Sequence, residues 1–496
     1  RLPEIGYYKT TDGRALYYMP SVAVTREEIR PNTDVEISFE DDICKHLDFK
    51  ILGEEDFKDL ARHIIGDYFR CHTPVATMTA FAHAMSAAIL PQLPLKKSPV
   101  LWLAGDYSNG KSFIAEGAQC FFGPFTEFLN AGGSDKAKVG AASHFRNATL
   151  MIDDYKQTLS DWGGKAILNF VQAAYDRSGR SALNRDGSMR RHTARVRGNI
   201  IITGEEVPTQ EASALSRMII VDVGSREKNR VHGEIVKTRR REYCGFTPHL
   251  LQYVYGLPDH DIRGIYLDYR AKLEEPIRER YEAEGAQRIA ENLAANMTAF
   301  RLAMDMLVAK GVLALEQRDA LCSQHMGNLE IIRAMVCNYV SAHRGANLFL
   351  EAVSVLLQNP ARYHIYGWPG TDLGEHKNSS MLGFYRDKEP GEIKLLPQAA
   401  YAAAAEFSHR NRHTLPPLPH IARQLLSGGH ICKERVDSGK EAQMGYKQVI
   451  SPHNNQRIRV WVLKTESLGM FAPPGTPARE EQQQQPPHPA LQAVGE

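Results

Sequence analysis

The twelve residues Leu101–Ser112, which read LWLAGDYSNGKS, constrain the fold more than any other part of this 496-residue chain. They contain the pattern G-x-x-x-x-G-K-[ST], with Gly105, Gly110, Lys111 and Ser112 at its fixed positions. The first glycine lets the chain turn sharply out of a strand, and the second leaves no Cβ to obstruct an anion. The pattern therefore predicts a phosphate loop between a buried strand and a helix N-terminus, where backbone N–H groups point at a phosphate.

The residue types in this loop predict separate chemical roles. Lys111 is expected to reach the β- and γ-phosphates of a nucleotide, and the Ser112 hydroxyl to hold Mg²⁺. Asn109 and Phe113 flank these residues and are included, with the two glycines, among the predicted nucleotide contacts. A chance glycine loop beside a lysine is the alternative, but an apolar strand pattern precedes this loop and a helical pattern follows it. The expected cofactors are therefore ATP and Mg²⁺.

Strand and helix patterns alternate from Pro99 to about Val223, which indicates an α/β fold with a parallel sheet. The expected architecture is a P-loop NTPase core with a five-stranded parallel sheet. The predicted strands are Val100–Ala104, Thr126–Asn130, Ala148–Asp153, Asn199–Thr203 and Met218–Val223, and the predicted helices span residues 111–121, 134–145 and 162–175.

The third predicted strand ends in an acidic pair, Asp153 and Asp154, within LMIDDY. This pair lies about 40 residues after the phosphate loop, with one strand and one helix between, which is typical of acids that act on Mg²⁺-ATP. Asp153 is expected to hold Mg²⁺ and Asp154 to polarise the attacking water. The alternative is a strand that ends in surface acids. Most such ATPases carry Glu at the second position, and Asp is one methylene shorter.

Two further polar residues lie at strand ends. Thr203 ends the fourth predicted strand and is either a sensor of the γ-phosphate or a simple strand-end hydroxyl. Arg217 stands where the fifth predicted strand begins. It is either an arginine finger that acts on the γ-phosphate of a neighbouring subunit or a surface arginine that caps the preceding helix.

The segment Arg177–Arg197 is strongly basic, with seven arginines and a single acid, Asp186. The dipeptide Asp186-Gly187 is a hairpin signal, so the segment is predicted to form a basic β-hairpin before the fourth strand. Guanidinium groups on a projecting hairpin can follow a phosphate backbone without reading bases. A solvated charge run is the alternative. The predicted DNA contacts are Arg185, Ser188, Arg190 and Arg191.

The order of these motifs resembles that in the hexameric replicative helicases of the AAA+ pre-sensor-hairpin clade. The order is phosphate loop, acidic strand end, basic hairpin, polar strand end and entering arginine. The stretch SGRSALNRDGSMRRHTARVRGNIIITGE resembles helicase modules of mobile genetic elements. These include phage and plasmid primase-helicases and the MCM-like helicases of staphylococcal cassettes and islands. The resemblance covers residues 75–225 and, loosely, the C-terminal part. It implies a ring of subunits with ATP sites at the interfaces and hairpins that line a central DNA channel.

The remaining chain is predicted to hold a small N-terminal region and two C-terminal parts. In the N-terminal region, RALYYMPS and DVEISFE are expected to be strands, followed by helices over residues 54–70 and 75–90. Long helical patterns follow at residues 286–310 and 315–357, and Arg301 is one option for a second sensor arginine. The predicted domains are an N-terminal β-rich and helical region (1–70), the AAA+ core (71–225), a helical lid and connector (226–375), a winged-helix domain (376–465) and a disordered tail (466–496).

The winged-helix prediction rests on two helical patterns, which are followed by two strand patterns around a hairpin. The hairpin would be basic, which favours contact with DNA or a replication fork over contact between subunits. Its basic residues are Lys433, Arg435, Lys440, Lys447, Arg457 and Arg459.

Composition limits the cellular setting. The formal net charge is only +2, so any nucleic-acid surface must be local. The seven cysteines are scattered singly, which argues against a zinc site or a disulfide framework and favours reduced thiols in the cytoplasm. No apolar run is long enough to span a membrane, and no signal peptide is evident.

The leading hypothesis is an ATP-driven, hexameric DNA helicase or translocase for replication of a mobile element. Its partners would be single-stranded DNA in the channel, duplex at the fork, other copies of the chain and a primase or other replication protein. The alternatives are an ATP-switched initiator or loader that does not unwind DNA, and a packaging or segregation motor.

Overall fold

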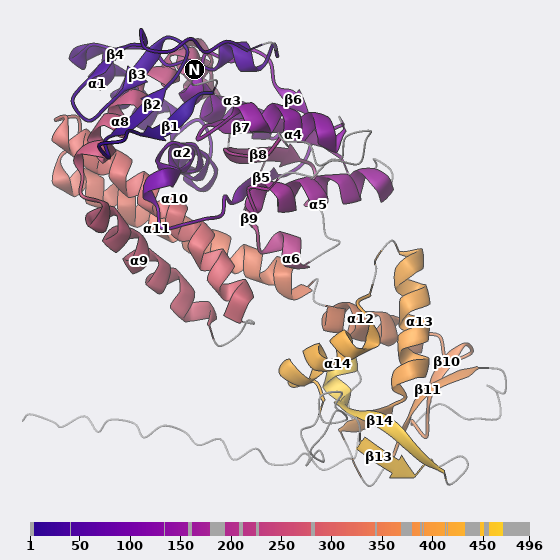
Figure 1. Cartoon of the computed structure of the whole chain (residues 1–496). Helices are drawn as coiled ribbons and strands as arrows, with labels where there is room; N and C mark the ends of the chain where they lie inside the picture. Colours follow the sequence, from indigo (N-terminus) through magenta and orange to yellow (C-terminus); the bar gives the residue numbers. More distant parts are fainter. Residues whose placement is uncertain are drawn as a thin grey trace, which may run out of the picture. The chain divides into compact units, whose positions relative to one another are not determined.

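The computed structural model places most of the chain in two compact units, Arg1–His343 and Arg344–Glu496. We describe each unit separately. Figure 1 gives the labels of the helices and strands. The residues described are 4–39, 41–132, 134–156, 161–178, 194–207, 212–224, 228–278, 283–342, 345–368, 379–386, 389, 391–411, 413, 415–431, 447–450 and 456–469.

A five-stranded parallel sheet forms the centre of the first unit and confirms the predicted α/β fold. Its strands are β5 (Val100–Ala104), β6 (Leu129–Asn130), β7 (Thr149–Tyr155), β8 (Asn199–Gly204) and β9 (Met218–Asp222). Their spatial order is β6-β7-β8-β5-β9. The apolar runs are buried on both faces, as in a sheet covered by helices. β6 is shorter than predicted, because residues 126–128 precede it without strand pairing.

Helices cover both faces of this sheet (Figure 1). α3 contacts β5, β7 and β8, α5 contacts β5, and the later helices α10 and α11 contact β9. The predicted core helices are confirmed. They are α3 (Lys111–Gln119, continued by the 3-10 helix η4, Cys120–Phe122), α4 (Asp135–His144) and α5 (Asp161–Tyr175), and the short α6 (Ala212–Leu215) follows β8.

Helix α2 (Pro74–Ile89) lies beside α3 and is buried almost all round. Its His83 links the helix to the sheet. His83 Nε2 bonds the Ile200 carbonyl at 3.0 Å, and Asn199 Nδ2 donates to the His83 carbonyl at 3.0 Å. Before α2, the structure has η1 (Cys44–His46), α1 (Glu54–His63) and the π-helix η2 (Ile64–Tyr68), and η3 (Leu90–Gln92) follows it.

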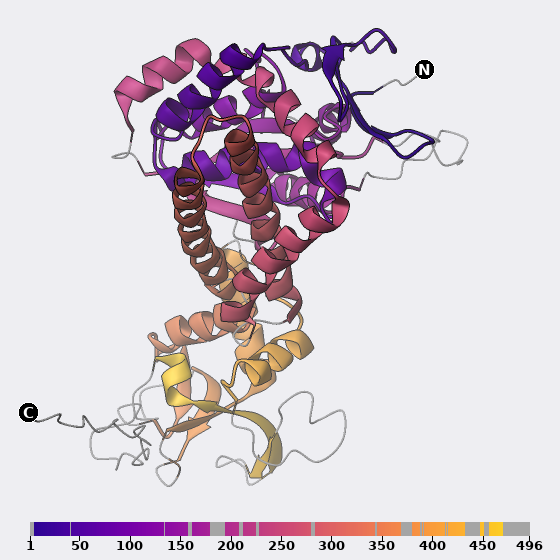
Figure 2. The same cartoon turned by 90° about the vertical axis from the view of Figure 1, so that its left-hand side faces the viewer.

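The rest of the first unit is helical, as predicted for this part of the chain. The long helices α10 and α11 lie side by side (Figures 1 and 2). His325 of α11 bonds Asn296 of α10 at 2.8 Å inside this contact. Arg301 forms an ion pair with Asp305 at 2.8 Å. The elements are α7 (Arg230–Arg239), η6 (Arg240–Gly245), α8 (Thr247–Gly256), α9 (Asp259–Glu274), η7 (Glu275–Ile277), α10 (Ala283–Ala309) and α11 (Leu315–Ala342).

The N-terminal region forms a four-stranded antiparallel sheet in the order β1-β2-β3-β4. Its strands are β1 (Gly6–Lys9), β2 (Ala15–Tyr18), β3 (Val22–Val24) and β4 (Ile29–Pro31). RALYYMPS contains β2, as predicted.

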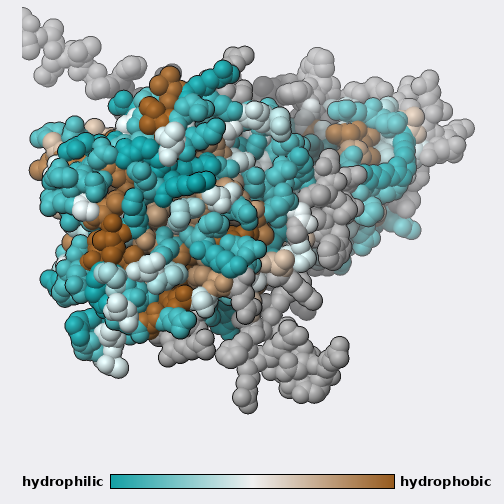
Figure 3. Space-filling model, turned by 90° about the horizontal axis from the view of Figure 1, so that it is seen from above, coloured by the Kyte–Doolittle hydropathy of each residue, from teal (hydrophilic) through white to brown (hydrophobic). Residues whose placement is uncertain are grey.

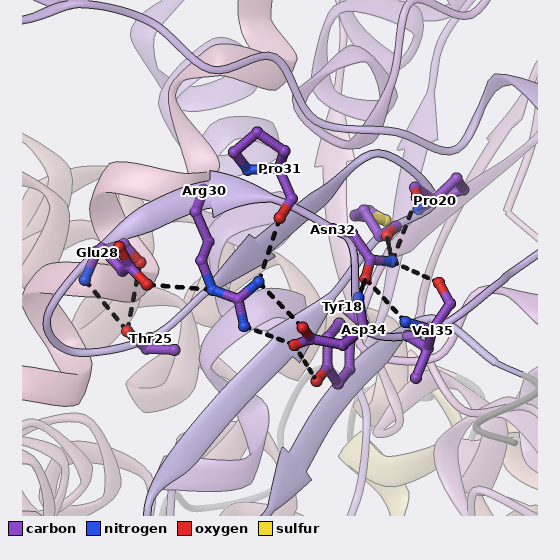
Figure 4. A network of polar contacts seen from close by, with 10 residues as sticks. Tyr18, Pro20, Thr25, Glu28, Arg30, Pro31, Asn32, Asp34 and Val35 are labelled. Carbon is purple, nitrogen blue, oxygen red and sulfur yellow. Dashed lines mark hydrogen bonds and ion pairs between the residues drawn. The ribbon is translucent and has the colours of Figure 1, made fainter.

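The strand predicted over DVEISFE is wrong, because side chains rather than a strand ladder hold its start (Figure 4). Asn32 Nδ2 donates to the Val35 carbonyl at 3.0 Å and to the Met19 carbonyl at 2.9 Å. Asp34 accepts from Arg30 at 2.5 Å and from the Tyr18 hydroxyl at 2.9 Å. These bonds give the backbone an alternative to strand pairing.

The second unit combines three helices with a five-stranded sheet in the order β10-β11-β12-β14-β13. Only the β10–β11 pair is parallel. Its core includes the edge-to-face pair of Phe349 and Trp461, with ring centroids 5.7 Å apart. The elements are α12 (Gly345–Leu357), β10 (Tyr363–Tyr366), β11 (Ser380–Tyr385), β12 (Glu392–Leu395), α13 (Pro397–Arg410), α14 (Leu418–Ser427), β13 (Lys447–Ile450), β14 (Arg457–Lys464) and the 3-10 helix η9 (Thr465–Leu468).

Two boundaries of this unit differ from the prediction. α12 and β10 had been assigned to the connector, but their apolar side chains are buried in the core of the second unit. The tail had been expected to begin at residue 466, but η9 continues the fold. Leu468 is buried, and its carbonyl accepts from the Ser354 hydroxyl at 2.8 Å. Residues 470–496 lie outside the described residues.

Apolar side chains on the face shown in Figure 3 form separate groups among hydrophilic residues. Within the described part of the chain, no helix has both the length and the apolarity needed to cross a membrane. The six cysteines described there are all buried and none forms a disulfide.

Three buried histidines of the first unit predict that acid destabilises it. Burial lowers the pKa of His83 and His249 to about 4 and that of His325 to about 3. An unfolded histidine titrates near 6.5, so the unfolded chain binds more protons below that pH. Each histidine should lower the free energy of unfolding by about 1.4 kcal/mol per pH unit as the pH drops from about 6.5 towards these values. Urea unfolding at pH 7, 6 and 5 measures this slope.

The variant His325→Gln separates the histidine effect from general acid sensitivity. Glutamine can still donate to Asn296 but does not titrate. The slope of the free energy of unfolding against pH should therefore lose the contribution of about one proton. An unchanged slope in this variant would contradict the assignment.

Candidate nucleotide site

The phosphate loop has the backbone geometry that its glycines predict. Gly110 has φ of 89° and Gly105 has φ of 149°, in regions that favour glycine. A Cβ on Gly105 would lie 2.4 Å from the Val223 carbonyl oxygen, so only glycine allows β5 and the chain after β9 to come this close. Ser108 also has a positive φ, of 66°. The loop therefore leaves β5 and enters α3 as predicted.

Lys111 is folded back into its own loop. Its ammonium donates to the Gly105 carbonyl at 2.6 Å and to the Asp106 carbonyl at 2.7 Å. Burial lowers its pKa, and the charges of Glu205, Asp106, Asp153 and Asp154 oppose that shift. The ammonium is therefore surrounded by negative charge inside a loop built to receive an anion.

Asp153 joins two hydroxyl groups at the carboxyl edge of the sheet. Its Oδ1 accepts from Ser112 Oγ at 2.7 Å and from Thr203 Oγ1 at 2.5 Å. The structure thus brings together three predicted site residues from α3, β7 and β8. Thr203 Oγ1 also accepts the Asp154 N–H at 3.1 Å, so this hydroxyl holds both acids of the pair.

Asp154 lies beside this group, but its carboxylate is engaged elsewhere. The residue has φ of 63°, and the β7–β8 register shifts between Ile152 and Tyr155. Its Oδ2 lies 3.3 Å from Lys156 Nζ. The two adjacent acids therefore differ in what their carboxylates contact: Asp153 faces two hydroxyls and Asp154 faces a cation.

The two residues that flank the loop have structural contacts. Asn109 Nδ2 donates to the Val223 carbonyl at 2.9 Å. The Asn109 carbonyl bonds His72 Nε2 at 3.1 Å, while His72 Nδ1 accepts the Thr73 N–H at 2.8 Å. These two contacts assign a neutral His72 with its proton on Nε2. Phe113 lies under the guanidinium of Arg240, 5.8 Å from the ring centroid.

Two charged residues near the loop were missed in the sequence. The stem of Lys228 passes over Gly110, with its Cε 3.1 Å from the position of a glycine Cβ. Glu205 follows β8, and its negative charge acts on the Lys111 ammonium. Glu205 could have been found, because it follows the predicted sensor strand. Lys228 has no comparable signal, since its position depends on how the chain turns after β9.

Arg217 lies at the amino edge of the sheet, opposite the phosphate loop. It directly precedes β9, and its guanidinium donates to the Ser213 carbonyl and lies over the Tyr175 ring, 5.7 Å from the centroid. Because the phosphate loop follows the carboxyl end of β5, Arg217 lies away from the phosphate loop of its own chain. Its bond to Ser213 of the preceding helix α6 is the contact expected of an arginine that caps this helix, and its action on a neighbouring subunit stays a prediction.

The predicted DNA contacts Arg185, Ser188, Arg190 and Arg191 lie outside the described residues. The two ends of the basic segment are described and meet at the amino edge. Arg177 donates to the Arg197 carbonyl at 2.8 Å, and the Asn147 N–H donates to the same carbonyl at 3.3 Å. Arg197 also pairs with Glu4 of the N-terminal region.

Comparisons with known proteins reveal a shared fold. No protein-family model matches the chain, and no curated protein matches it in sequence. Among solved structures, it is similar to one titled "SCCmec type IV Cch, active helicase", with a TM-score of 0.62 and 13% sequence identity. The match covers 95% of this chain and 82% of the helicase. The fold of the chain is therefore similar to that of a protein described as an active helicase.

Two glycine substitutions, one in the phosphate loop and one in α11, should change the stability of the protein in opposite directions. Gly110→Ala should destabilise the protein by about 1 kcal/mol, because alanine is strained at a left-handed φ. Its Cβ would also meet the Lys228 stem. Gly327→Ala, inside α11 with open space around it, should stabilise the protein by about 0.5–1 kcal/mol. Thermal unfolding of both variants measures this difference, and equal shifts would contradict it.

Proposed function

We propose that this protein is an ATP-dependent DNA helicase or translocase that serves replication of a mobile genetic element. The observation that carries the proposal is the bond pair on Asp153 Oδ1, which unites the phosphate-loop serine with the ends of β7 and β8. In open α/β sheets, ligands bind at the carboxyl ends of strands where the strand order reverses. β5 lies at such a point, between β8 and β9.

The residues present suit Mg²⁺-ATP. Ser112 Oγ and Asp153 Oδ1 are hard oxygen donors 2.7 Å apart, and Mg²⁺ is commonly held by one or two protein oxygens and the substrate phosphates. When bound, the ion would neutralise charge on the β- and γ-phosphates. Lys111 would exchange its two loop carbonyls for phosphate oxygens, and Thr203 would keep Asp153 in place. Asp154 is the predicted residue for polarising the water.

The position of Arg217 supports a shared site between subunits. Its guanidinium is at the sheet edge opposite its own phosphate loop, so a role on a γ-phosphate requires a neighbouring copy. Such a head-to-tail contact generates a ring when the rotation closes. We propose a homo-oligomeric ring, with six subunits as in the resembling AAA+ helicases, in which Arg217 acts in trans.

DNA as the substrate has three independent supports. The segment Arg177–Arg197 carries seven arginines and one acid. The fold is similar to that of a protein described as an active helicase. The second unit places α13 and α14 before the β13–β14 hairpin, an arrangement that fits the proposed winged-helix domain. A primase or another replication protein remains part of the proposal as a partner.

Unwinding of a forked DNA tests the proposal. The wild-type protein with Mg²⁺-ATP should separate the strands, and Lys111→Ala should lose at least a hundredfold in ATP hydrolysis, because the lysine stabilises the transferred phosphate. Negative-stain images with ATP and DNA should show closed rings. A persistent monomer would contradict the oligomeric motor. Slow ATP hydrolysis without unwinding would favour an initiator or loader.

The basic segment predicts a separation of functions. The double variant Arg185→Ala and Arg190→Ala should keep DNA-independent ATP hydrolysis but lose its stimulation by single-stranded DNA. Removing two phosphate contacts should also make DNA binding less sensitive to salt. The slope of the logarithm of the binding constant against the logarithm of the salt concentration should fall in magnitude by roughly 1.4, at about 0.7 per contact on single strands. ATPase assays with and without DNA, over a salt series, measure both effects. Loss of nucleotide binding in this variant would contradict the assignment.

A further inference from the structure

Glu205 leaves the sheet directly beside the phosphate loop. β8 lies between β5 and β7, and Gly204 at its end pairs with Ala104 of β5. The Gly105 N–H donates to the Gly204 carbonyl at 3.2 Å, and the Glu205 N–H donates to the Tyr155 carbonyl at 3.3 Å. The Glu205 backbone is thus fixed between the start of the phosphate loop and the end of the acidic strand.

Glu205 directly follows the end of β8, close to the residues already gathered at Asp153. Thr203, two residues earlier, directs its hydroxyl to Asp153, and the Glu205 N–H is bonded across to Tyr155 of β7. Glu206 comes next, and its carbonyl accepts from Trp102 Nε1 at 3.2 Å.

The carboxylates of the site differ in their availability. Asp153 Oδ1 already accepts two hydroxyl groups, and Asp154 is paired with Lys156. The Glu205 carboxylate has no hydrogen-bond or ion-pair partner among the described residues, and the residue is exposed. Unlike Asp153 and Asp154, it can accept a proton without first giving up a contact.

The charge distribution places Glu205 close to the phosphate-binding lysine. The charge of Glu205 acts on the Lys111 ammonium, together with the charges of Asp106, Asp153 and Asp154.

We propose that Glu205, rather than Asp154, is the catalytic residue that polarises the water attacking ATP. The inference deepens the proposed function and rests on it. The water oxygen would form a bond to the γ-phosphorus as the bond from that phosphorus to the β,γ-bridging oxygen breaks. The Glu205 carboxylate accepts the water proton and later releases it to solvent. The products are ADP, inorganic phosphate and one proton. The longer glutamate side chain supplies the reach that Asp154 lacks.

Glu205→Gln tests the proposal, with Glu206→Gln as the matched control. Glutamine keeps the size of the side chain but cannot accept the proton, so kcat for ATP hydrolysis should fall by roughly a hundredfold or more. The dissociation constant for Mg²⁺-ATP should stay within about threefold of wild type, because the residue acts on water and not on ATP. Glu206→Gln should keep wild-type kcat. Asp154→Asn should lose clearly less than Glu205→Gln.

The outcomes separate this inference from the proposed function. Wild-type kcat in Glu205→Gln, or a larger loss in Asp154→Asn, would overturn the assignment while leaving the ATPase intact. Weakened ATP binding in Glu205→Gln would assign the residue to binding instead and would also overturn it. Absence of ATP hydrolysis by the wild-type protein would reject the proposed function itself. Glu205→Asp should recover part of kcat, which a purely structural role would not produce.

Discussion

The bonds from two hydroxyl groups to one carboxylate oxygen of Asp153 determine how the candidate site is built. Ser112 lies in the first turn of α3, Asp153 near the end of β7 and Thr203 near the end of β8, so three segments far apart in sequence meet at one atom. Hydrogen bonds to an ionised acceptor are stronger than those between neutral groups. They hold the hydroxyls where phosphate and Mg²⁺ would arrive. The sheet therefore presents a preorganised edge before any ligand is present.

Much of the first unit could be predicted because its elements have strong local signals. The apolar runs of β5, β8 and β9 can be satisfied only in a covered sheet, and the loop Gly105–Ser112 fixes where the first helix begins. The failures occur where side chains override the local pattern. DVEISFE alternates like a strand, but Asn32 bonds the Val35 carbonyl and Asp34 pairs with Arg30 of β4. Boundaries of the second unit failed because burial of Phe349 is a tertiary property.

The same distinction applies to the site residues. Ser112, Asp153 and Thr203 meet at one carboxylate, because parallel strands bring their carboxyl ends to one edge and α3 begins there. Arg217 lies at the opposite, amino edge, because it precedes β9 and all strands of the sheet run in one direction. The engagement of Asp154 by Lys156 depends on a positive φ and a register shift, which no pattern of residue types reveals.

β8 connects the two edges on which the proposed function depends. Arg197 and the ends of the basic segment lie at its amino end, and Thr203 and Glu205 lie at its carboxyl end. At roughly 3.3 Å per residue, these edges are about 20 Å apart. The strand between them is fully buried, and close-packed interiors transmit displacement instead of absorbing it. The contacts of Arg197 at the amino edge and those of Thr203 at the carboxyl edge are therefore joined by one close-packed strand.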